Sequence, residues 1–195
     1  DANTVEADIV SLRIAELLAE DHFLLSPSTL LGIDRHLFTD VFSEEIPVGK
    51  FRKVNITKKE PVLDGDTVQY SSHFMIQDTL VYDFEREQNF SYAGLTNEQK
   101  ALHAMTFLAD IWQVHPFREG NTRTVAVFGI QYLRKLGFHI DNSLFSEHAA
   151  YFRNSLVFYH HHGEKQDKHF LKIFFENLLL GKKNVLLDED MYAKE

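Results

Sequence analysis

The sequence contains no cysteine, and this absence narrows the chemistry open to the protein. Without thiols there can be no disulfide framework, no thiolate nucleophile and no zinc site built from cysteines. The sequence also lacks an apolar run long enough to cross a membrane, and its start lacks the pattern of a signal peptide. We therefore expect a soluble, cytoplasmic protein, with delivery to another cell left open as an alternative.

Positive charge is also scarce, since 20 Lys and Arg stand against 29 Asp and Glu, for a formal net charge of -9. Such a chain has no general basic surface with which to bind nucleic acid. What the sequence does contain is apolar: 44% of its 195 residues are hydrophobic, and 17 are Phe. This is enough for one sizeable core, so we predict a single domain over residues 1–195.

Most of the apolar residues recur with the spacing of α-helices, which predicts an all-α (mainly α) fold. A first helix is expected over residues 4–18, and a second follows the break at Ser26-Pro27-Ser28. Thr96-Asn-Glu-Gln99 has the form of a capping box and predicts the start of a helix that reaches Trp112. Further helical patterns cover residues 76–84, 121–136, 145–159 and 167–181, followed by a short tail over 182–195.

One region predicts β structure. Val54-Asn-Ile56 and Val68-Gln-Tyr70 alternate apolar with polar residues, and Asp64-Gly65 between them is a strong turn signal. The pair is too small to form a core sheet. We predict a β-hairpin that acts as a flap.

The richest chemistry lies between two helical patterns, in the stretch His115-Pro-Phe-Arg-Glu-Gly-Asn-Thr-Arg123. Pro116 disfavours helix at His115, and Gly120-Asn121 opens the next helix. The free amides at a helix start, here those of Gly120, Asn121 and Thr122, attract anions such as phosphate. Arg123 could add a bidentate contact to phosphate oxygens.

Two further residues of this stretch complete a set of groups for phosphoryl or nucleotidyl transfer. Glu119 would repel a phosphate unless a divalent ion such as Mg²⁺ bridged the two. His115 can accept a proton near neutral pH. Each residue also fits an ordinary structural role, as turn residues, a first-turn carboxylate and a satisfied histidine, so the residues alone leave both interpretations open.

The stretch HPFREGNTR resembles the signature of the Fic domain, of the Fic and death-on-curing superfamily, written His-Pro-Phe-x-Asp/Glu-Gly-Asn-Gly/Lys-Arg. Only Thr122 departs from it. The segments Leu37-Phe-Thr-Asp-Val-Phe42 and Gly49-Lys-Phe-Arg52 are similar to upstream segments of this family, and the expected hairpin falls where Fic proteins carry a flap. The resemblance covers residues of about 30–181, with the helix over 4–18 outside this core.

The resemblance implies a Fic-type helical bundle and a protein adenylyltransferase that moves AMP from ATP to a hydroxyl side chain of a target protein. It implies that His115 is the catalytic base and that Glu119 holds Mg²⁺. The flap near Asp64-Gly65 would bind the target by strand addition. The residues that it implies for nucleotide binding are Phe117, Arg118, Gly120, Asn121, Thr122 and Arg123, with Phe117 also anchoring the loop in the core.

Two positions depart from the pattern of the AMP-transferring members. Ala126 stands where many of them carry a second arginine, and Thr122 matches neither these members nor the lysine of the phosphorylating death-on-curing toxins. A Fic phosphotransferase, a de-AMPylase and a non-catalytic ATP-binding regulatory module therefore stay as alternatives. No segment fully matches the family's inhibitory motif, Ser/Thr-x-x-x-Glu-Gly/Asn, so self-inhibition and an inhibitory partner both stay open.

Two other features have structural interpretations beside functional ones. His160-His-His162 cannot share one helical face, so we expect the polar end of a helix and not a metal site. Tyr151 could line an adenine pocket, but core packing explains it equally well.

Overall fold

A computed structural model describes residues 2–192 of the chain. The helices are α1 (Ala2–Leu18), α2 (Pro27–Phe38), α3 (Ile76–Gln88), α4 (Asn97–Val114), α5 (Asn121–Lys135), α6 (Ser143–Glu147), α7 (Ala149–His160) and α8 (His169–Leu180). Short 3-10 turns lie at Pro61–Leu63, His73–Met75 and Asp188–Met191. No strand occurs within residues 2–192, so the expectation of a mainly α fold is confirmed.

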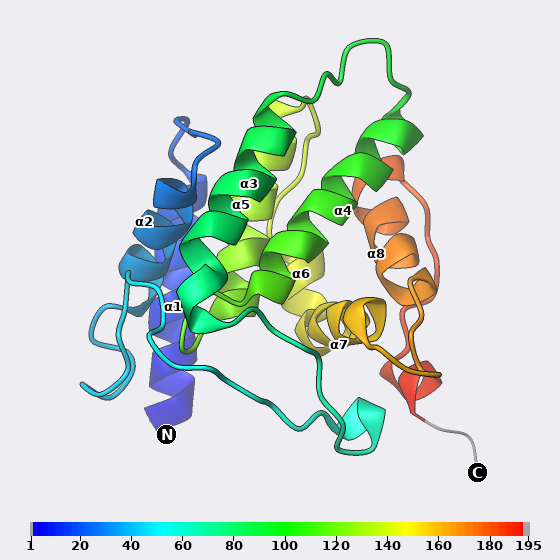
Figure 1. Cartoon of the computed structure of the whole chain (residues 1–195). Coiled ribbons are helices and arrows are strands. Elements are labelled where there is room, and N and C mark those ends of the chain that lie inside the picture. Colours follow the sequence, from blue (N-terminus) through cyan, green and yellow to red (C-terminus); the bar gives the residue numbers. More distant parts are fainter. Residues whose placement is uncertain (1, 193–195) are drawn as a thin grey trace.

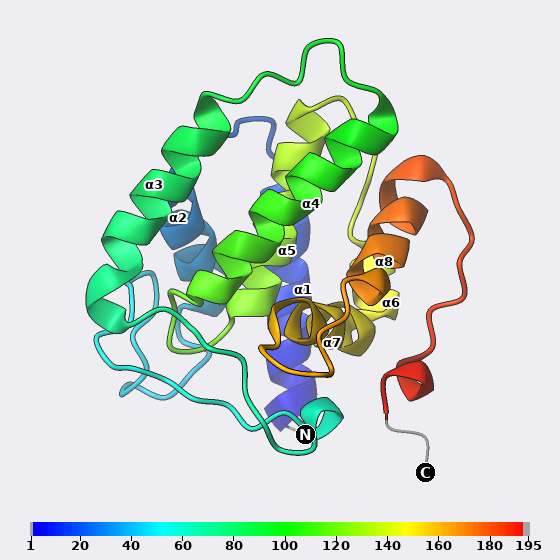
Figure 2. The same ribbon diagram turned by 45° about the vertical axis from the view of Figure 1, so that its right-hand side comes forward.

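Helices α4 and α5 run antiparallel through the centre of the molecule (Figures 1 and 2). Helices α2 and α3 flank them on one side, α7 and α8 on the other, and α1 packs on α2 and α5. The loop of residues 115–120 joins the lower ends of α4 and α5, and the irregular segment 39–75 passes beneath that end (Figure 1). Segments far apart in sequence therefore meet at the lower end of the bundle.

Local sequence signals explain several helix ends. Thr96 Oγ1 accepts a hydrogen bond from Gln99 N at 3.1 Å, and Gln99 Oε1 accepts one from Thr96 N at 2.9 Å, which confirms the capping box. Ser26 caps α2 ahead of Pro27, and Gly181 ends α8 with a φ of 68°. One prediction was wrong: residues 145–159 do not form a single helix, because the backbone leaves helical geometry at His148 (φ -125°, ψ 41°).

One continuous core joins the helices. Phe128 of α5 is fully buried, and its ring lies 5.3 Å from that of Phe23, 5.6 Å from Phe84 and 6.3 Å from Phe107. These partners come from the segment before α2, from α3 and from α4. Because aromatic side chains bury large areas, this cluster ties α3, α4 and the segment before α2 to α5.

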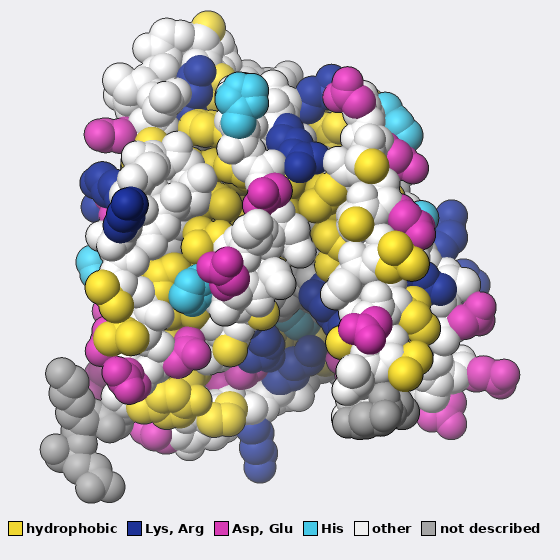
Figure 3. Space-filling view, turned by 180° about the vertical axis from the view of Figure 1, so that it is seen from behind, with side chains coloured by type: hydrophobic (Ala, Val, Ile, Leu, Met, Phe, Trp, Pro, Cys, Tyr) yellow, Lys and Arg dark blue, Asp and Glu magenta, His cyan; other side chains and the backbone are white. Residues whose placement is uncertain are grey.

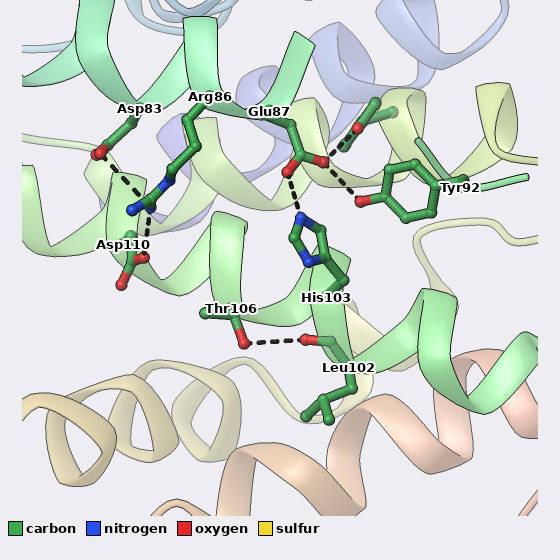
Figure 4. A network of polar contacts seen from close by, with 9 residues as sticks. Asp83, Arg86, Glu87, Tyr92, Leu102, His103, Thr106 and Asp110 are labelled. Carbon is green, nitrogen blue, oxygen red and sulfur yellow. Dashed lines mark hydrogen bonds and ion pairs between the residues drawn. The ribbon is translucent and has the colours of Figure 1, made fainter. Parts of the chain in front are cut away.

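A buried carboxylate fastens α3 to its neighbours away from the loop of residues 115–120. Glu87 is 4% exposed, and its carboxylate accepts hydrogen bonds from Tyr92 and Tyr132, both at 2.5 Å, and pairs with His103 Nε2 at 2.9 Å (Figure 4). Charge-assisted bonds of this kind compensate the cost of burying the carboxylate. The network connects α3, α4 and α5 with the turn that follows α3.

The predicted β-hairpin is not formed: residues 54–72, called the flap below, contain no strand. Its two arms, residues 54–59 and 66–72, belong to no helix or strand. They are joined through the 3-10 turn at Pro61–Leu63 and through Asp64 and Gly65, which both have a positive φ. Between the arms, Glu60 N donates to Asp66 O at 2.9 Å, and no strand ladder follows within the described residues. The arms bond to other groups instead: Arg52 Nη1 donates to Val54 O, and Gln113 Nε2 donates to Gln69 O.

Candidate active site

The loop after α4 begins with a strained residue. His115 follows the last residue of α4 and adopts a left-handed conformation, with φ 51° and ψ 61°. Its N–H donates to Trp112 O at 3.0 Å, and the next residue, Pro116, cannot continue the helix. Left-handed backbone is costly for a non-glycine residue and persists only where the surroundings hold it.

Arg52 supplies that support. Its side chain is 2% exposed, and its Nε donates to His115 O at 2.7 Å. Its Nη2 donates to Val114 O at 3.1 Å and to Ser71 O at 2.5 Å, and its backbone N donates to Pro116 O at 2.8 Å. One buried guanidinium thus joins the end of α4 to both arms of the flap.

The imidazole of His115 is held in one tautomer. Its Nδ1 lies 3.0 Å from Trp112 O, a carbonyl that can only accept, so Nδ1 carries the proton and Nε2 keeps a lone pair. His115 is 1% exposed, and Nε2 is buried without a hydrogen-bond partner in the described part of the chain. Burial, together with the nearby charge of Lys58, lowers the pKa of His115 well below its usual value. The side chain is therefore a neutral proton acceptor.

The second half of the loop closes on itself. Asn121 Nδ2 donates to Phe117 O at 2.8 Å, and Phe117 N donates to Asn121 Oδ1 at 2.9 Å. The Phe117 ring is buried and lies 6.0 Å from that of Phe51, so it anchors the loop in the core. Gly120 has a φ of 83°, and a Cβ placed there would lie 2.4 Å from Phe38 Cε2, so only glycine fits.

The start of α5 offers uncapped amides. No side chain caps this helix, whose N-cap is Gly120. Thr122 does not compete for the amides, because its Oγ1 accepts a hydrogen bond from Trp112 Nε1 at 2.9 Å. The Arg123 guanidinium stacks over the Phe38 ring at 4.6 Å, at the same helix start. This arrangement, called the cradle below, has the chemistry to bind an anion.

The remaining charged residues surround this cradle. Arg118 is exposed and Glu119 is half-buried. Lys58 is also half-buried; burial lowers its pKa, while the carboxylates of Glu119 and Glu60 raise it. Glu60 is buried in a bidentate ion pair with Arg153, with both N–O distances at 2.7 Å. A mixed set of cations and carboxylates therefore lines the site.

A cavity of about 330 Å³ lies beside the cradle, between α1, α5, α6 and α7. Thr122, Arg123 and Ala126 contribute to its α5 wall, and apolar side chains such as Val10 and Phe152 line it. From the side opposite to Figure 1, Lys and Arg side chains gather in a hollow on the lower half of the molecule (Figure 3). The cavity combines an apolar interior with a cationic side chain at its border.

Several residues of the site had no assigned role in the sequence analysis. Arg52 lies in a segment that resembles the family and Tyr70 in an alternating segment, but neither pattern indicates a function, and Arg153 lies in an ordinary helical pattern. Lys58 is half-buried between the flap and the loop. The only available signal was the isolated basic run of residues 50–59, which contains five Lys and Arg and no acid.

The histidine run and Tyr151 have structural roles. His160 is buried and its Nε2 contacts Ala109 O at 2.7 Å, while His161 Nε2 pairs with Asp66 at 2.9 Å. Tyr151 is 1% exposed and donates to Phe170 O, as in core packing. Within residues 2–192 no group of three or more His, Asp or Glu is placed to hold a metal ion.

The fold and this site define a helical domain in which a buried imidazole and an uncapped helix start are joined by one short loop. The sequence model of the Fic/DOC family matches residues 24–133, which is more than half of the chain. The chain therefore belongs to the Fic/DOC family, as the signature in its loop predicted.

Two curated relatives are named as adenylyltransferases. The protein adenylyltransferase VbhT of Bartonella schoenbuchensis is 31% identical over 112 residues, which cover 56% of this chain and 21% of VbhT. The probable protein adenylyltransferase y4lH of Sinorhizobium fredii is 41% identical over 69 residues, which cover 30% of this chain and 36% of that protein. The matches thus span only about a fifth and about a third of these relatives.

Solved structures share the fold. The N-terminal Fic domain of a Bep effector protein from Bartonella quintana, with bound ADP, has a TM-score of 0.71 and 20% identity, covering 91% of this chain and 84% of that one. BepC from Bartonella tribocorum, with bound AMPPNP, has a TM-score of 0.70 and 18% identity, covering 91% and 85%. In this chain, no helix within residues 2–192 is both long and apolar enough to span a lipid bilayer.

Proposed function

We propose that the protein is a protein adenylyltransferase, which transfers AMP from ATP to a hydroxyl side chain of a target protein. The observation that carries the proposal is that one loop contains both the buried, unprotonated Nε2 of His115 and the uncapped amides at the start of α5. The first is a proton acceptor and the second an anion cradle. Membership of the Fic/DOC family and relatives named as adenylyltransferases support the same activity.

In this proposal His115 is the general base. Its Nε2 takes the proton of the target hydroxyl, the hydroxyl oxygen bonds to the α-phosphorus of ATP, and pyrophosphate leaves. The amides of Gly120, Asn121 and Thr122 stabilise charge on the phosphate oxygens, and Arg123 holds a second phosphate. Removing such a base costs on the order of 10²–10⁴ in rate.

Glu119 fits a role in holding Mg²⁺. Its carboxylate is half-buried at the cradle, and magnesium commonly uses one or two carboxylates together with phosphate oxygens and water. Because no cluster of three ligands occurs within residues 2–192, the protein would hold the ion only together with a nucleotide. When bound, Mg²⁺ neutralises negative charge on the phosphates.

The flap is our proposed docking site for the target. A groove of about 460 Å³ lies between the arms, lined by residues 55–57 and 66–72 and by His161 and His162. Since the arms form no strand ladder with each other, the backbone groups that Arg52 and Gln113 do not hold are available to an added strand. Lys58 and Lys59 on one arm, with Lys53 just before it, would favour an acidic target segment.

Ala126 supports a second candidate, a regulatory module that binds ATP without turnover. It lines the cavity at the position where many AMP-transferring Fic proteins carry an arginine, and it adds no charge there. A bound nucleotide would then be held without the usual contact to its terminal phosphate. A Fic phosphotransferase or a de-AMPylase would differ from this module by modifying or releasing a covalent group.

Intact-mass spectrometry after incubation with ATP and Mg²⁺ tests these functions. We expect wild-type protein to modify itself or an added target by the mass of one AMP, and the His115→Ala variant to show no addition. His139→Ala is the matched control, because His139 is exposed and far along the chain from the loop. A phosphate-sized addition would indicate a phosphotransferase. ATP binding in calorimetry without any addition, even on candidate targets, would favour the regulatory module.

A further inference from the structure

Tyr70 covers the proton acceptor of the site. Its ring stacks on the imidazole of His115, with centroids 4.0 Å apart and planes 23° from parallel. The same ring meets Trp112 edge-on at 5.8 Å, and Trp112 meets His115 edge-on at 5.0 Å. With Nε2 of His115 buried and unpartnered, no target hydroxyl can reach it in this conformation.

The imidazole itself cannot move out from under this cover. Its Nδ1 is bonded to Trp112 O, and the backbone on either side is fixed by Arg52 through His115 O and Pro116 O. The left-handed backbone at His115 also ties the ring direction to the end of α4. Any opening must therefore come from Tyr70.

Tyr70 lies outside the helices, and its side chain is less firmly held than the imidazole. Residues 66–72 belong to no helix or strand. Gln69 O accepts from Gln113 Nε2 at 3.2 Å, and Ser71 O accepts from Arg52 Nη2 at 2.5 Å. The backbone on either side of Tyr70 is therefore anchored, and the motion is that of its side chain. The Tyr70 hydroxyl is buried without a hydrogen-bond partner, which costs free energy that a shift toward solvent would recover. Tyr70 also lines the flap groove, so it stands between the groove and the base.

We propose that Tyr70 is a gate: its ring closes over His115 Nε2 in this conformation, and it swings toward the flap groove to admit the target hydroxyl. The inference rests on the proposed role of His115 and adds a control on it. A closed gate keeps water from the base while no target is bound, and a segment that fills the groove meets Tyr70 first. Regulation of the site thus lies within the flap that also binds the target.

Reactivity of His115 toward diethylpyrocarbonate, followed residue by residue by mass spectrometry, tests the gate without any nucleotide. In wild-type protein we expect His115 to react at least about tenfold more slowly than the exposed His139. Tyr70→Ala should raise the His115 rate by about tenfold or more, while Tyr70→Phe, which keeps the ring, should leave it slow. His160, buried in the core, reports that the fold is intact.

Two results would overturn the gate. The first is that His115 of wild-type protein reacts with diethylpyrocarbonate as fast as His139. The second is that His115 still reacts slowly in Tyr70→Ala while His160 stays protected. If Tyr70→Ala unfolds and His160 becomes reactive, Tyr70→Leu is measured in its place, together with the His115 ring-proton shift by NMR. An upfield shift in wild type and Tyr70→Phe supports the stack, and an unshifted proton in wild type rejects it.

The outcome is separable from that of the proposed function. A masked His115 that Tyr70→Ala unmasks supports the gate even if no AMP transfer is ever seen. The opposite outcome is AMP transfer that depends on His115 while His115 of wild-type protein reacts as fast as an exposed histidine. That outcome would support the proposed function and reject the gate.

Discussion

At the residue scale, the site depends on a few backbone positions that tolerate no side chain or hold strain. Gly120 is the sharpest of these, because it needs both a positive φ and space. The buried Phe38 ring fills the place where a Cβ would stand, and Phe38 in turn stacks on Phe42 at 4.9 Å. A close-packed interior cannot absorb such an overlap without moving the loop.

We predict that Gly120→Ala destabilises the protein and weakens ATP binding together. Gly137→Ala is the matched control, because Gly137 also has a positive φ, 100°, but nothing lies within 4 Å of its added Cβ. The control should lose about 1–2 kcal/mol of unfolding free energy from backbone strain alone. Gly120→Ala should lose about 1–3 kcal/mol more through overpacking. Urea unfolding measures the stability of each variant, and calorimetry measures its affinity for ATP. Equal losses of unfolding free energy in Gly120→Ala and Gly137→Ala would contradict the clash with Phe38.

His160 gives a prediction for pH. Burial lowers the pKa of His160 from 6.5 to about 4, because desolvation disfavours the charged ring by more than the hydrogen bond to Ala109 O favours it. Because the pKa of His160 is lower in the folded than in the unfolded state, the neutral ring contributes its full stabilisation of the fold above pH 6.5. This contribution is lost as the pH falls toward 4. The loss is about 3 kcal/mol at most. Urea unfolding at pH 7 and pH 4 should show a smaller pH dependence for His160→Gln than for wild type, and His139→Gln should match wild type.

At the element scale, the end of α4 and the flap form one unit through Arg52. Four backbone carbonyls, those of Val54, Ser71, Val114 and His115, accept from its guanidinium. These acceptors come from three separate stretches of the chain. Arg52 is therefore the side chain that ties both flap arms to the end of α4, and the arms form no strand ladder with each other.

We predict that Arg52→Lys costs about 2–4 kcal/mol of unfolding free energy, because an ammonium cannot reproduce the planar fork and leaves buried carbonyls unpaired. Arg86→Lys is the control: Arg86 is exposed and its two ion pairs, at 3.6 and 3.8 Å, are of the weak surface type. Limited proteolysis should cut the flap of Arg52→Lys faster than that of Arg86→Lys. Equal cleavage would show that the arms have other support.

The same elements show what the sequence could and could not predict. Capping signals such as Thr96 to Gln99 are local, and so is the nine-residue loop that carries His115, so both could be found from neighbouring residues. Arg52 lies 63 residues from His115, and nothing in its own segment indicates that contact. Apolar and polar residues alternate in the flap arms as they do in β-strands. This alternation does not determine whether an arm pairs with another strand. The break at His148 carries no Gly or Pro to mark it.

At the scale of the whole molecule, the site is rigid only because the entire bundle shares one core. The aromatic cluster around Phe128 includes residues from α3, α4 and α5, and the buried side chains of α7 and α8 continue it without a gap. Trp112, the single Trp, is fully buried beneath His115 and Tyr70. Its fluorescence therefore reports on the site, whereas far-UV circular dichroism reports on all the helices.

We predict that the two signals follow one cooperative unfolding transition in urea, and that Phe128→Ala shifts both to the same lower midpoint. The cavity left by the ring should cost about 3–5 kcal/mol. Phe74→Ala is the control, since Phe74 is 70% exposed and its loss should change stability by no more than about 0.5 kcal/mol. Because a two-state domain loses its parts together, Trp112 cannot leave its site while the helices persist. Separate midpoints for the two signals would instead show that the flap and loop unfold independently of the bundle, and the site would then owe its geometry to Arg52 and its local contacts alone.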